Sequence, residues 1–318
     1  MKNIFFITHF SSKFGFGHIK RCLSIAGHFP KVKKIIINLE NQKLNTIFNQ
    51  KVYPKNYLKK LNNEKSVNII DLLPKEYYKN KSLFLNLKKK NSFIIDNGFK
   101  QKTIFYNSIY PYINNGETVS KYVGEKYFIL DKKIIEISLK KKNKKNRVLI
   151  CMGGSDPDCF TEKVLRIFVK IKHDLKVDVI IGPYFDKIRT NNIKKIVKNK
   201  KNYTFHLNPR NIYEIISRSK FGVVSYGNIK YESIFLNTPV ILLSNRKHQK
   251  ICVNFSKKFN TINNKFTFNR NKIYRLLENK IFDTNLMNSN LKLAIKNIDL
   301  NKFNKTIKLI KKINENKK

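Results

Sequence analysis

The most constraining feature of this chain is its repeated alternation of short apolar runs with longer amphipathic stretches. Apolar runs of strand length occupy residues 3–8, 34–39, 67–72 and 92–96, and then 147–152, 177–181, 203–207, 221–225 and 239–243. Most of them are followed by apolar side chains at helical spacing. This order is typical of βα units around a mostly parallel sheet, so an α/β fold is predicted.

A lysine-rich run divides the chain into two halves. It ends abruptly at the strand that begins at Arg147, and we place a domain boundary within about 135 to 147 because domains of ~150 residues are common. Both halves have the pattern of a Rossmann-like domain, in which ligands bind beyond the carboxyl ends of the strands. We therefore predict two such domains, residues 1–140 and 141–318, which face each other across a cleft.

The chain is strongly basic. Its 318 residues include 66 Lys and Arg against 21 Asp and Glu, which gives a net charge of +45. A basic protein that binds nucleic acid or an anionic surface, with strongly salt-dependent affinity, is one interpretation. However, the lysines occur with many Asn and Ile and few Arg, as an AT-rich coding bias produces, and there is no zinc-finger, helicase or RNA-recognition motif. We therefore expect no nucleic-acid partner.

The cysteines and the N-terminus indicate where the protein works. The four cysteines, Cys22, Cys151, Cys159 and Cys252, include no CxxC pair, which argues against a disulfide framework or a zinc site. The longest apolar run in the first ten residues has four residues, which is too short for a signal segment. No apolar stretch of 18 residues follows. We expect a reduced, cytoplasmic protein with no membrane span, no metal and no cofactor.

The first candidate site is the segment from Ser11 to Arg21, which follows the first strand and opens a helix. Gly15 and Gly17 permit close approach of the backbone to an anion near the helix N-terminus. His18 falls off the apolar stripe of the helix and shares a face with Arg21. The field at a helix N-terminus disfavours an imidazolium, and a neutral imidazole is what a general base requires. A capping or loop-stabilising role for His18 is the alternative.

The second candidate site is a glycine turn after the strand at 147–152. Gly153 and Gly154 allow a pyrophosphate or a sugar to approach the backbone, and Ser155 and Asp156 are suited to cap a following helix. The alternative is a purely structural strand–turn–helix connection that binds no ligand.

The third candidate site follows the strand at 221–225. Glu232 can accept two ribose hydroxyls, or it can simply complement the dipole of the helix that begins there. Asn228 can contact a ligand or cap the same helix. A polar loop that ends at Gln249 follows the next strand, which Pro239 begins.

These motifs together resemble one enzyme family. Gly-Phe-Gly-His-Ile-Lys-Arg at 15–21, Ile-Cys-Met-Gly-Gly-Ser-Asp at 150–156 and Glu232 resemble the nucleotide-sugar hydrolase of pseudaminic acid biosynthesis and its spore-coat polysaccharide relatives. That family removes UDP from UDP-2,4-diacetamido-2,4,6-trideoxy-β-L-altropyranose and is similar in fold to the GT-B glycosyltransferases. The resemblance extends from the first strand to Gln249.

The resemblance implies a role for each domain and for individual residues. Residues 1–140 would hold the sugar and carry the catalytic loop, and residues 141–318, with the C-terminal helices, would bind UDP. The histidine of the Gly-x-Gly-His motif is the family's proposed base, which implies that role for His18. Substrate-binding positions are Gly15, Gly17, Arg21 and Asp96, and nucleotide-binding positions are Gly153, Gly154, Ser155, Asn228, Glu232 and Gln249.

Two positions depart from the family pattern. Where the family has Asp-His-Tyr, this chain has Asp96-Asn97-Gly98, and where the family has Asn-Gln, it has His248-Gln249. The prediction is hydrolysis of a UDP-linked diacetamido-trideoxy sugar. A GT-B glycosyltransferase that uses a UDP-sugar donor is the first alternative, and the basic nucleic-acid or anionic-surface binder is the second.

Overall fold

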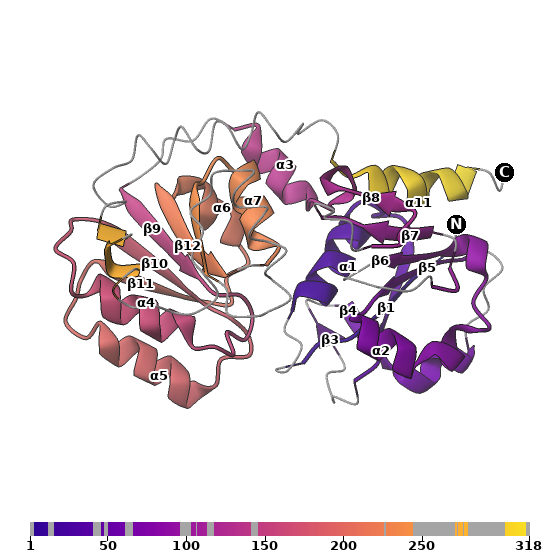
Figure 1. Ribbon diagram of the computed structural model, residues 1–318, viewed down its shortest axis with the longest axis horizontal. Coiled ribbons are helices and arrows are strands. Elements are labelled where there is room, and N and C mark those ends of the chain that lie inside the picture. The colour runs from indigo at the N-terminus through magenta and orange to yellow at the C-terminus, as the bar shows by residue number, and fades with distance from the viewer. Residues whose placement is uncertain are drawn as a thin grey trace. The chain divides into compact units, whose positions relative to one another are not determined.

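The computed structural model describes residues 3–11, 16–40, 46–47, 50–60, 66–95, 103–105, 107–112, 118–140, 146–225, 227–243, 271, 273–275, 277–278 and 303–315. The chain forms two compact units. The first unit combines Met1–Lys132 with Asn301–Lys318, and the second unit is Lys133–Leu300. Each unit contains one sheet with helices packed against it (Figure 1).

The first unit has an eight-stranded sheet in the order β3-β4-β2-β1-β5-β6-β7-β8. Every strand pair is parallel except β3 with β4. The strands are β1 Asn3–Thr8, β2 Lys33–Asn38, β3 Thr46–Ile47, β4 Gln50–Pro54, β5 Ser66–Asp71, β6 Ser92–Ile95, β7 Asn107–Tyr110 and β8 Tyr122–Val123.

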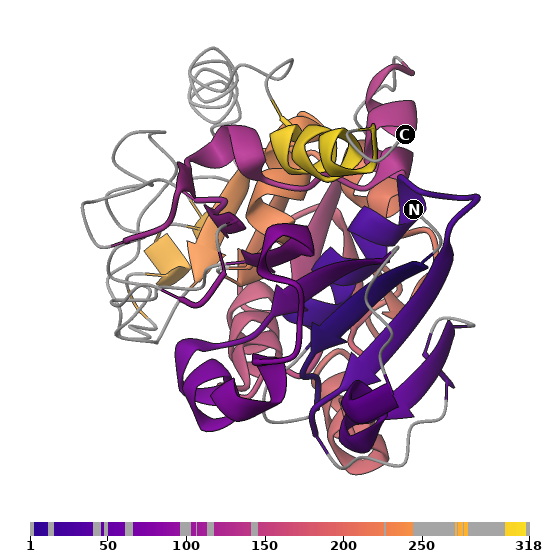
Figure 2. The same ribbon diagram turned by 90° about the vertical axis from the view of Figure 1, so that its right-hand side faces the viewer.

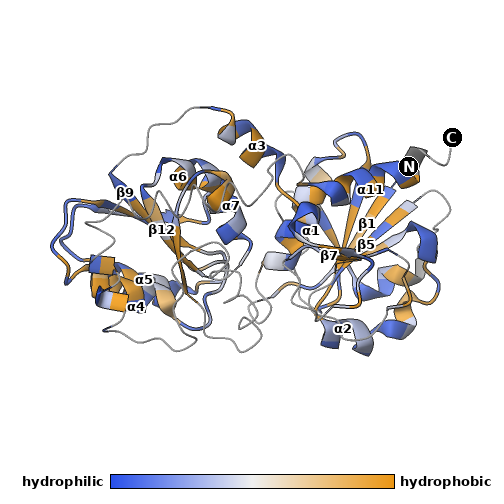
Figure 3. Cartoon of the chain, turned by 45° about the horizontal axis from the view of Figure 1, so that its top comes forward, coloured by the Kyte–Doolittle hydropathy of each residue, from blue (hydrophilic) through white to orange (hydrophobic). Residues whose placement is uncertain are grey.

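Apolar side chains cover both faces of this sheet, as continuous hydrophobic strands require. On one face, Ile4 and Phe6 of β1 pack in a cluster with Ile19 of α1 (Gly17–Gly27) and Ile310 of α11 (Lys305–Glu315). On the other face, Phe5 and its neighbours pack against α2 (Pro74–Lys79) and the 3-10 helix η2 (Lys81–Phe84). Figure 2 shows α11 in yellow and Figure 3 shows the predominantly hydrophobic strands.

The second unit has a five-stranded parallel sheet in the order β11-β10-β9-β12-β13. Helices α4 and α5 contribute to the core on one face, and α6 and α7 contact β9, β12 and β13. The elements are β9 Arg147–Cys151, α4 Phe160–Phe168, β10 Lys176–Ile181, α5 Lys187–Ile196, β11 Tyr203–Leu207, α6 Ile212–Arg218, β12 Phe221–Ser225, α7 Ile229–Phe235 and β13 Val240–Leu243.

Short helices complete the described elements. They are α3 Lys132–Ser138 and the 3-10 helices η1 Lys55–Lys60, η3 Lys89–Asn91 and η4 Glu125–Tyr127.

Each sheet reverses its winding direction at one point. In the first unit, β2 lies on one side of β1 and β5 lies on the other. In the second unit, β10 lies on one side of β9 and β12 on the other. In open α/β sheets such a switch point leaves a crevice beyond the carboxyl ends of the strands, where ligands bind. The segments after β1, β5, β9 and β12 are therefore where site residues belong.

The C-terminal helix departs from the predicted domain arrangement. The prediction assigned the C-terminal helices to residues 141–318, whereas α11 belongs to the first unit. Asn304 fixes it there, since its backbone N–H donates to the Phe128 carbonyl at 3.1 Å and its side-chain oxygen accepts from Leu130 N–H at 2.8 Å. Burial of Ile307 and Ile310 in the first core supplies the driving force. The boundary along the chain falls at Lys132 rather than at 140.

Candidate active site

Helix α1 presents His18 beside the switch point of the first sheet. The helix begins at Gly17, and the fully buried side chains of Ile19, Cys22 and Ile25 fix its rotation about its axis. His18 and Arg21 are one turn apart and therefore lie on the same side of the helix. His18 is 8% exposed and Arg21 is 4% exposed, so both side chains are buried.

A carboxylate from β5 joins these two side chains. Asp71 is the last residue of β5 and pairs in register with Thr8 of β1. Its Oδ1 lies 2.6 Å from His18 Nδ1 and 2.6 Å from Arg21 Nη2, and its Oδ2 accepts from Arg21 Nε at 2.6 Å. Arg21 thus binds the carboxylate with two nitrogens, the strong fork geometry of guanidinium–carboxylate pairs.

The ionised carboxylate of Asp71 identifies the donor in its contact with His18. Burial alone would raise the pKa of Asp71, but the Arg21 guanidinium and His18 outweigh it and hold that pKa well below its ordinary value. An ionised carboxylate only accepts hydrogen bonds, so His18 Nδ1 carries the proton in this contact. In the neutral ring, Nε2 is then the basic nitrogen, and within the described residues it has no hydrogen-bond partner in the structure.

Two further side chains complete the cluster. Arg21 Nη1 donates to the hydroxyl of Tyr112, a residue that follows β7. The His9 ring lies edge-on to that of His18, with centroids 4.4 Å apart. Burial, aided by the nearby His18, lowers the pKa of His9 to about 3. His9 therefore packs against His18 as a neutral ring near pH 7.

Sequence reasoning did not find Asp71, His9 or Tyr112. The prediction named Asp96 as the first-domain carboxylate, and that residue lies outside the described residues, as does Gly15. Asp71 could have been predicted. It is the last residue of β5, and the ends of the strands beside a switch point are where site residues are expected. All three guanidinium nitrogens of Arg21, a predicted substrate-binding residue, contact Asp71 or Tyr112.

In the second unit, the predicted glycine turn follows β9. Gly153 has a φ of +86°, a left-handed conformation that favours glycine. The turn packs closely against Gly182, at the end of β10. A Cβ at Gly182 would lie 2.4 Å from the Gly154 carbonyl oxygen and 2.5 Å from that of Gly153. Tyr184 N–H also donates to Gly154 O at 3.0 Å. The turn is thus held at the carboxyl edge of the sheet.

Asp156 and Arg189 hold the segment after the turn. As predicted, Asp156 caps the next helix: its side chain accepts from the Phe160 and Thr161 amides, both at 2.9 Å. Arg189 of α5 pairs with Asp156 Oδ2 at 2.8 Å and donates to the Ser155 carbonyl at 2.9 Å. Because Asp156 already satisfies the first amides of α4, a bound phosphate would have to meet the turn at 153–155 rather than that helix end.

The third predicted segment follows β12 at the other side of the switch point. Asn228 is the N-cap residue of α7, but its side chain makes no capping hydrogen bond to the helix. Glu232 lies in the first turn of α7 and is 4% exposed. Gln249 lies outside the described residues. The switch point of the second sheet is therefore flanked by the glycine turn and by the segment that carries Asn228 and Glu232.

The described part of the chain contains neither a metal-binding cluster nor a membrane-spanning helix. No group of three or more His, Cys, Asp or Glu side chains is arranged there to hold a metal ion. None of the helices described is long and apolar enough to span a membrane.

Comparison with known proteins identifies the fold. No family model matches the chain. Over 137 residues it is 29% identical to the uncharacterised protein MJ1062 of Methanocaldococcus jannaschii, a match that covers 41% of this chain and 28% of that protein. The chain therefore spans less than a third of that relative's length.

Solved structures match nearly the whole chain. WaaG, a glycosyltransferase involved in lipopolysaccharide biosynthesis, matches with a TM-score of 0.55 and 10% identity over 98% of both chains. MnaA of S. aureus in its co-structure with UDP matches with a TM-score of 0.60 and 12% identity over 92% of both chains. At such identities the likeness defines architecture alone: this chain has the GT-B fold, with two Rossmann-like parallel sheets.

Proposed function

We propose that this protein hydrolyses a UDP-linked diacetamido-trideoxy sugar to the free sugar and UDP, in the biosynthesis of a pseudaminic-type acid. The observation that carries the proposal is the contact between His18 and Asp71 at the switch point of the first sheet, 2.6 Å between Nδ1 and Oδ1. This contact leaves His18 Nε2 as the basic nitrogen, which is what activation of water requires.

In the proposed reaction, water is the nucleophile. His18 Nε2 takes a proton from water while the water oxygen forms a bond to the anomeric carbon. The bond between that carbon and the UDP oxygen breaks, and UDP leaves with the bonding electron pair. Asp71 stabilises the imidazolium that forms, and Arg21 keeps Asp71 ionised. The proton on His18 then returns to solvent.

The second unit would bind UDP. In this proposal the turn at Gly153, Gly154 and Ser155 contacts the diphosphate with backbone amides, and Glu232 accepts hydrogen bonds from the ribose hydroxyls. Asn228 and Gln249 are further nucleotide contacts. The closeness of the turn to Gly182 and its support by Arg189 favour this role, because a rigid turn places amides in advance of binding. The reaction requires no cofactor.

Two other observations support the proposal. The motifs at 15–21 and 150–156 resemble the hydrolase family, and the fold is shared with MnaA, which was solved with UDP. The shared fold with WaaG supports transfer of the sugar to an acceptor hydroxyl equally well. Hydrolysis and transfer differ only in whether water or an acceptor reaches the anomeric carbon.

The direct test is UDP release from purified protein. UDP-2,4-diacetamido-2,4,6-trideoxy-β-L-altropyranose and its stereoisomers are supplied with and without added sugar acceptors, and UDP-N-acetylglucosamine serves as the comparison substrate. The proposal predicts UDP release without any acceptor. Release that depends on an acceptor would identify a transferase, and absence of release from every UDP-sugar would refute both.

A further inference from the structure

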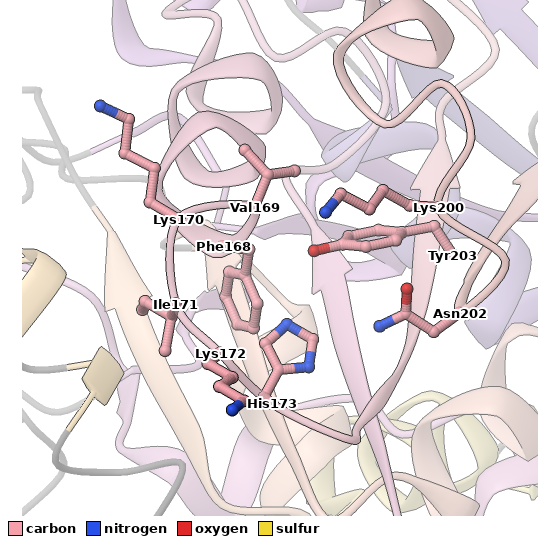
Figure 4. Close-up of a pocket in the computed structure, with 9 residues that line it drawn as sticks. All are labelled: Phe168, Val169, Lys170, Ile171, Lys172, His173, Lys200, Asn202 and Tyr203. Carbon is pink, nitrogen blue, oxygen red and sulfur yellow. The ribbon is translucent and has the colours of Figure 1, made fainter.

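A pocket lies at the opposite edge of the second sheet from the glycine turn. It is formed by the end of α4 and the segment that leads into β10, together with the segment between α5 and β11 (Figure 4). Its volume is about 350 Å³. The strands β10 and β11 begin here, whereas the proposed nucleotide site is at their carboxyl edge.

The pocket has a cationic rim over an aromatic floor. Lys170, Lys172 and Lys200 line the pocket, and all three side chains are exposed. None of them is in an ion pair with another described residue. The Lys170 amine points away from Tyr203 and His173 (Figure 4). The buried ring of Phe168 lies below the lysines, 5.7 Å from the His173 ring centroid. In Figure 4 the Lys200 amine lies beside the Tyr203 hydroxyl, near the His173 ring. The lining contains no Asp or Glu.

Several groups in this pocket are hydrogen-bond donors or unsatisfied. His173 Nδ1 is buried and has no hydrogen-bond partner among the described residues, a costly state that requires an explanation. Burial raises the pKa of Tyr203 to about 12, so its hydroxyl remains a donor at neutral pH. Ammonium groups and a phenol are suited to bind phosphate oxygens.

The backbone around the pocket is fixed without a ligand. Asn202 joins the two segments, because its carbonyl accepts from Val177 N–H at 2.8 Å and its side chain donates to the Leu175 carbonyl at 3.0 Å. Lysine ammonium groups interact favourably with the exposed carbonyl groups at the C-terminal ends of helices such as α4 and α5. Lysine is also common throughout this chain, so some lysines are expected near these helix ends. That effect does not account for the grouping of the Lys200 amine and the Tyr203 hydroxyl on one side of the pocket, near His173, whose Nδ1 has no partner among the described residues.

We propose that this pocket binds a phosphate-bearing anion. It is a site separate from the nucleotide and sugar sites, and the proposal does not depend on the hydrolase activity. The ligand is a free phosphate or phosphate ester, or the headgroup of a phosphorylated lipid. Both present the same oxyanion, and the experiment distinguishes them.

The test measures binding of inorganic phosphate to the full chain by calorimetry at constant ionic strength, with UDP present in excess. The variant Lys172→Ala/Lys200→Ala removes two rim charges, and Tyr203→Phe removes the hydroxyl while it keeps the ring. The control Lys194→Ala/Lys198→Ala removes the same charge from exposed positions in and just after α5. A parallel arm measures flotation with phosphatidylcholine vesicles that contain phosphatidic acid.

The pocket double variant should weaken phosphate or vesicle binding by roughly tenfold or more, and the control by less than about twofold, since charge-assisted contacts are worth about that much. Pocket-dependent binding to vesicles alone would identify a lipid headgroup, and pocket-dependent binding of free phosphate would identify a soluble ligand. Equal weakening in both double variants would mean general attraction to a basic surface and would overturn the site. Absence of binding in both arms would also overturn it. Because the readout compares variants of this pocket, it is valid whether or not UDP binds elsewhere.

Discussion

At the scale of single residues, the central feature is the Asp71 carboxylate, which contacts both the Arg21 guanidinium and the His18 ring. Asp71 is fully buried. A buried charge is costly unless it is paired and hydrogen-bonded. Arg21 supplies that pairing, so the carboxylate stays ionised and can orient His18. The arrangement is suited to a histidine that must keep one nitrogen basic.

We predict that His18→Ala lowers kcat by roughly 10²–10⁴ and leaves UDP affinity unchanged, because general-base catalysis contributes about that much. Asp71→Asn should also lower kcat, but it should add little in the His18→Ala background, since Asp71 acts through His18. Steady-state kinetics of the two single variants and the double variant test this, with melting temperatures to verify folding. His28→Ala, at the other end of α1, is the control. Additive losses in the double variant would separate Asp71 from the base.

Glu232 has a different predicted signature, because a ribose contact is made equally in the ground and transition states. Glu232→Gln should raise KM and weaken UDP binding by roughly tenfold to a hundredfold, with kcat nearly unchanged. If Glu232 only complements the dipole of α7, the change should cost at most about 1 kcal/mol of stability and leave UDP affinity as it was. Calorimetry with UDP, measured beside the melting temperature, distinguishes these results.

At the scale of elements, the glycine turn depends on a second glycine in the next strand–helix connection. Gly182→Ala would place a Cβ 2.4 Å from the Gly154 carbonyl oxygen. We expect it to destabilise the second unit by about 1–3 kcal/mol, the usual cost of overpacking, and to weaken UDP binding by displacing the turn. Gly27→Ala is the matched control, because a Cβ there meets nothing within 4 Å. Equal effects of the two changes on melting temperature and UDP affinity would contradict this account.

Three strands of the second sheet are joined by a buried ion cluster. Asp178 of β10 pairs with Arg147 of β9 at 2.5 Å and with His206 of β11 at 2.7 Å. Burial alone would raise the pKa of Asp178, but the bonds to Arg147 and His206 hold it below its ordinary value of 3.8. Because the folded pKa is lowered, the stabilisation is present above about pH 4 and is lost as pH falls through the folded pKa.

We therefore predict that Asp178→Asn destabilises the second unit by about 3–5 kcal/mol at pH 7, because it leaves the largely buried Arg147 guanidinium without its carboxylate. The difference between variant and wild type should shrink as pH falls below about 4. Chemical denaturation at several pH values measures it, with the exposed Asp174→Asn as the control. A difference that does not change with pH would contradict the role of Asp178 as the ionised partner.

At the scale of the whole molecule, the strands buried on both faces were predictable. Strands β1, β11 and β12 begin and end at the predicted residues, and the other six predicted strands differ by one residue at one or both ends. Continuous apolar runs of four to eight residues, followed by turn residues, are typical of such strands. Strand β11 (YTFHL) is partly exposed and was predictable from its β-branched and aromatic residues. The strands β3, β4, β7 and β8 were not predicted, because their short sequences, such as Asn107–Tyr110, carry polar residues and no apolar run.

Long-range contacts account for what sequence reasoning missed. The partner of His18 is 53 residues away along the chain, and no local pattern identifies it. Likewise, the apolar face of α11 is compatible with packing on either sheet. Only contacts far apart in sequence show that α11 covers the first sheet: Ile307 and Ile310 pack in its core, and Thr306 donates to the Tyr127 carbonyl. By contrast, the glycine turn after β9 was predicted, because all its residues are neighbours in sequence.

The measurement that tests the central claim most directly is hydrolysis of the UDP-linked diacetamido-trideoxy sugar in ¹⁸O-water, followed by mass spectrometry of both products. Attack of water on the anomeric carbon, with His18 as the base, predicts one ¹⁸O atom in the free sugar and none in UDP. Label in the terminal phosphate of UDP would mean that water attacks phosphorus and that the phosphorus–oxygen bond breaks. That result would contradict the account.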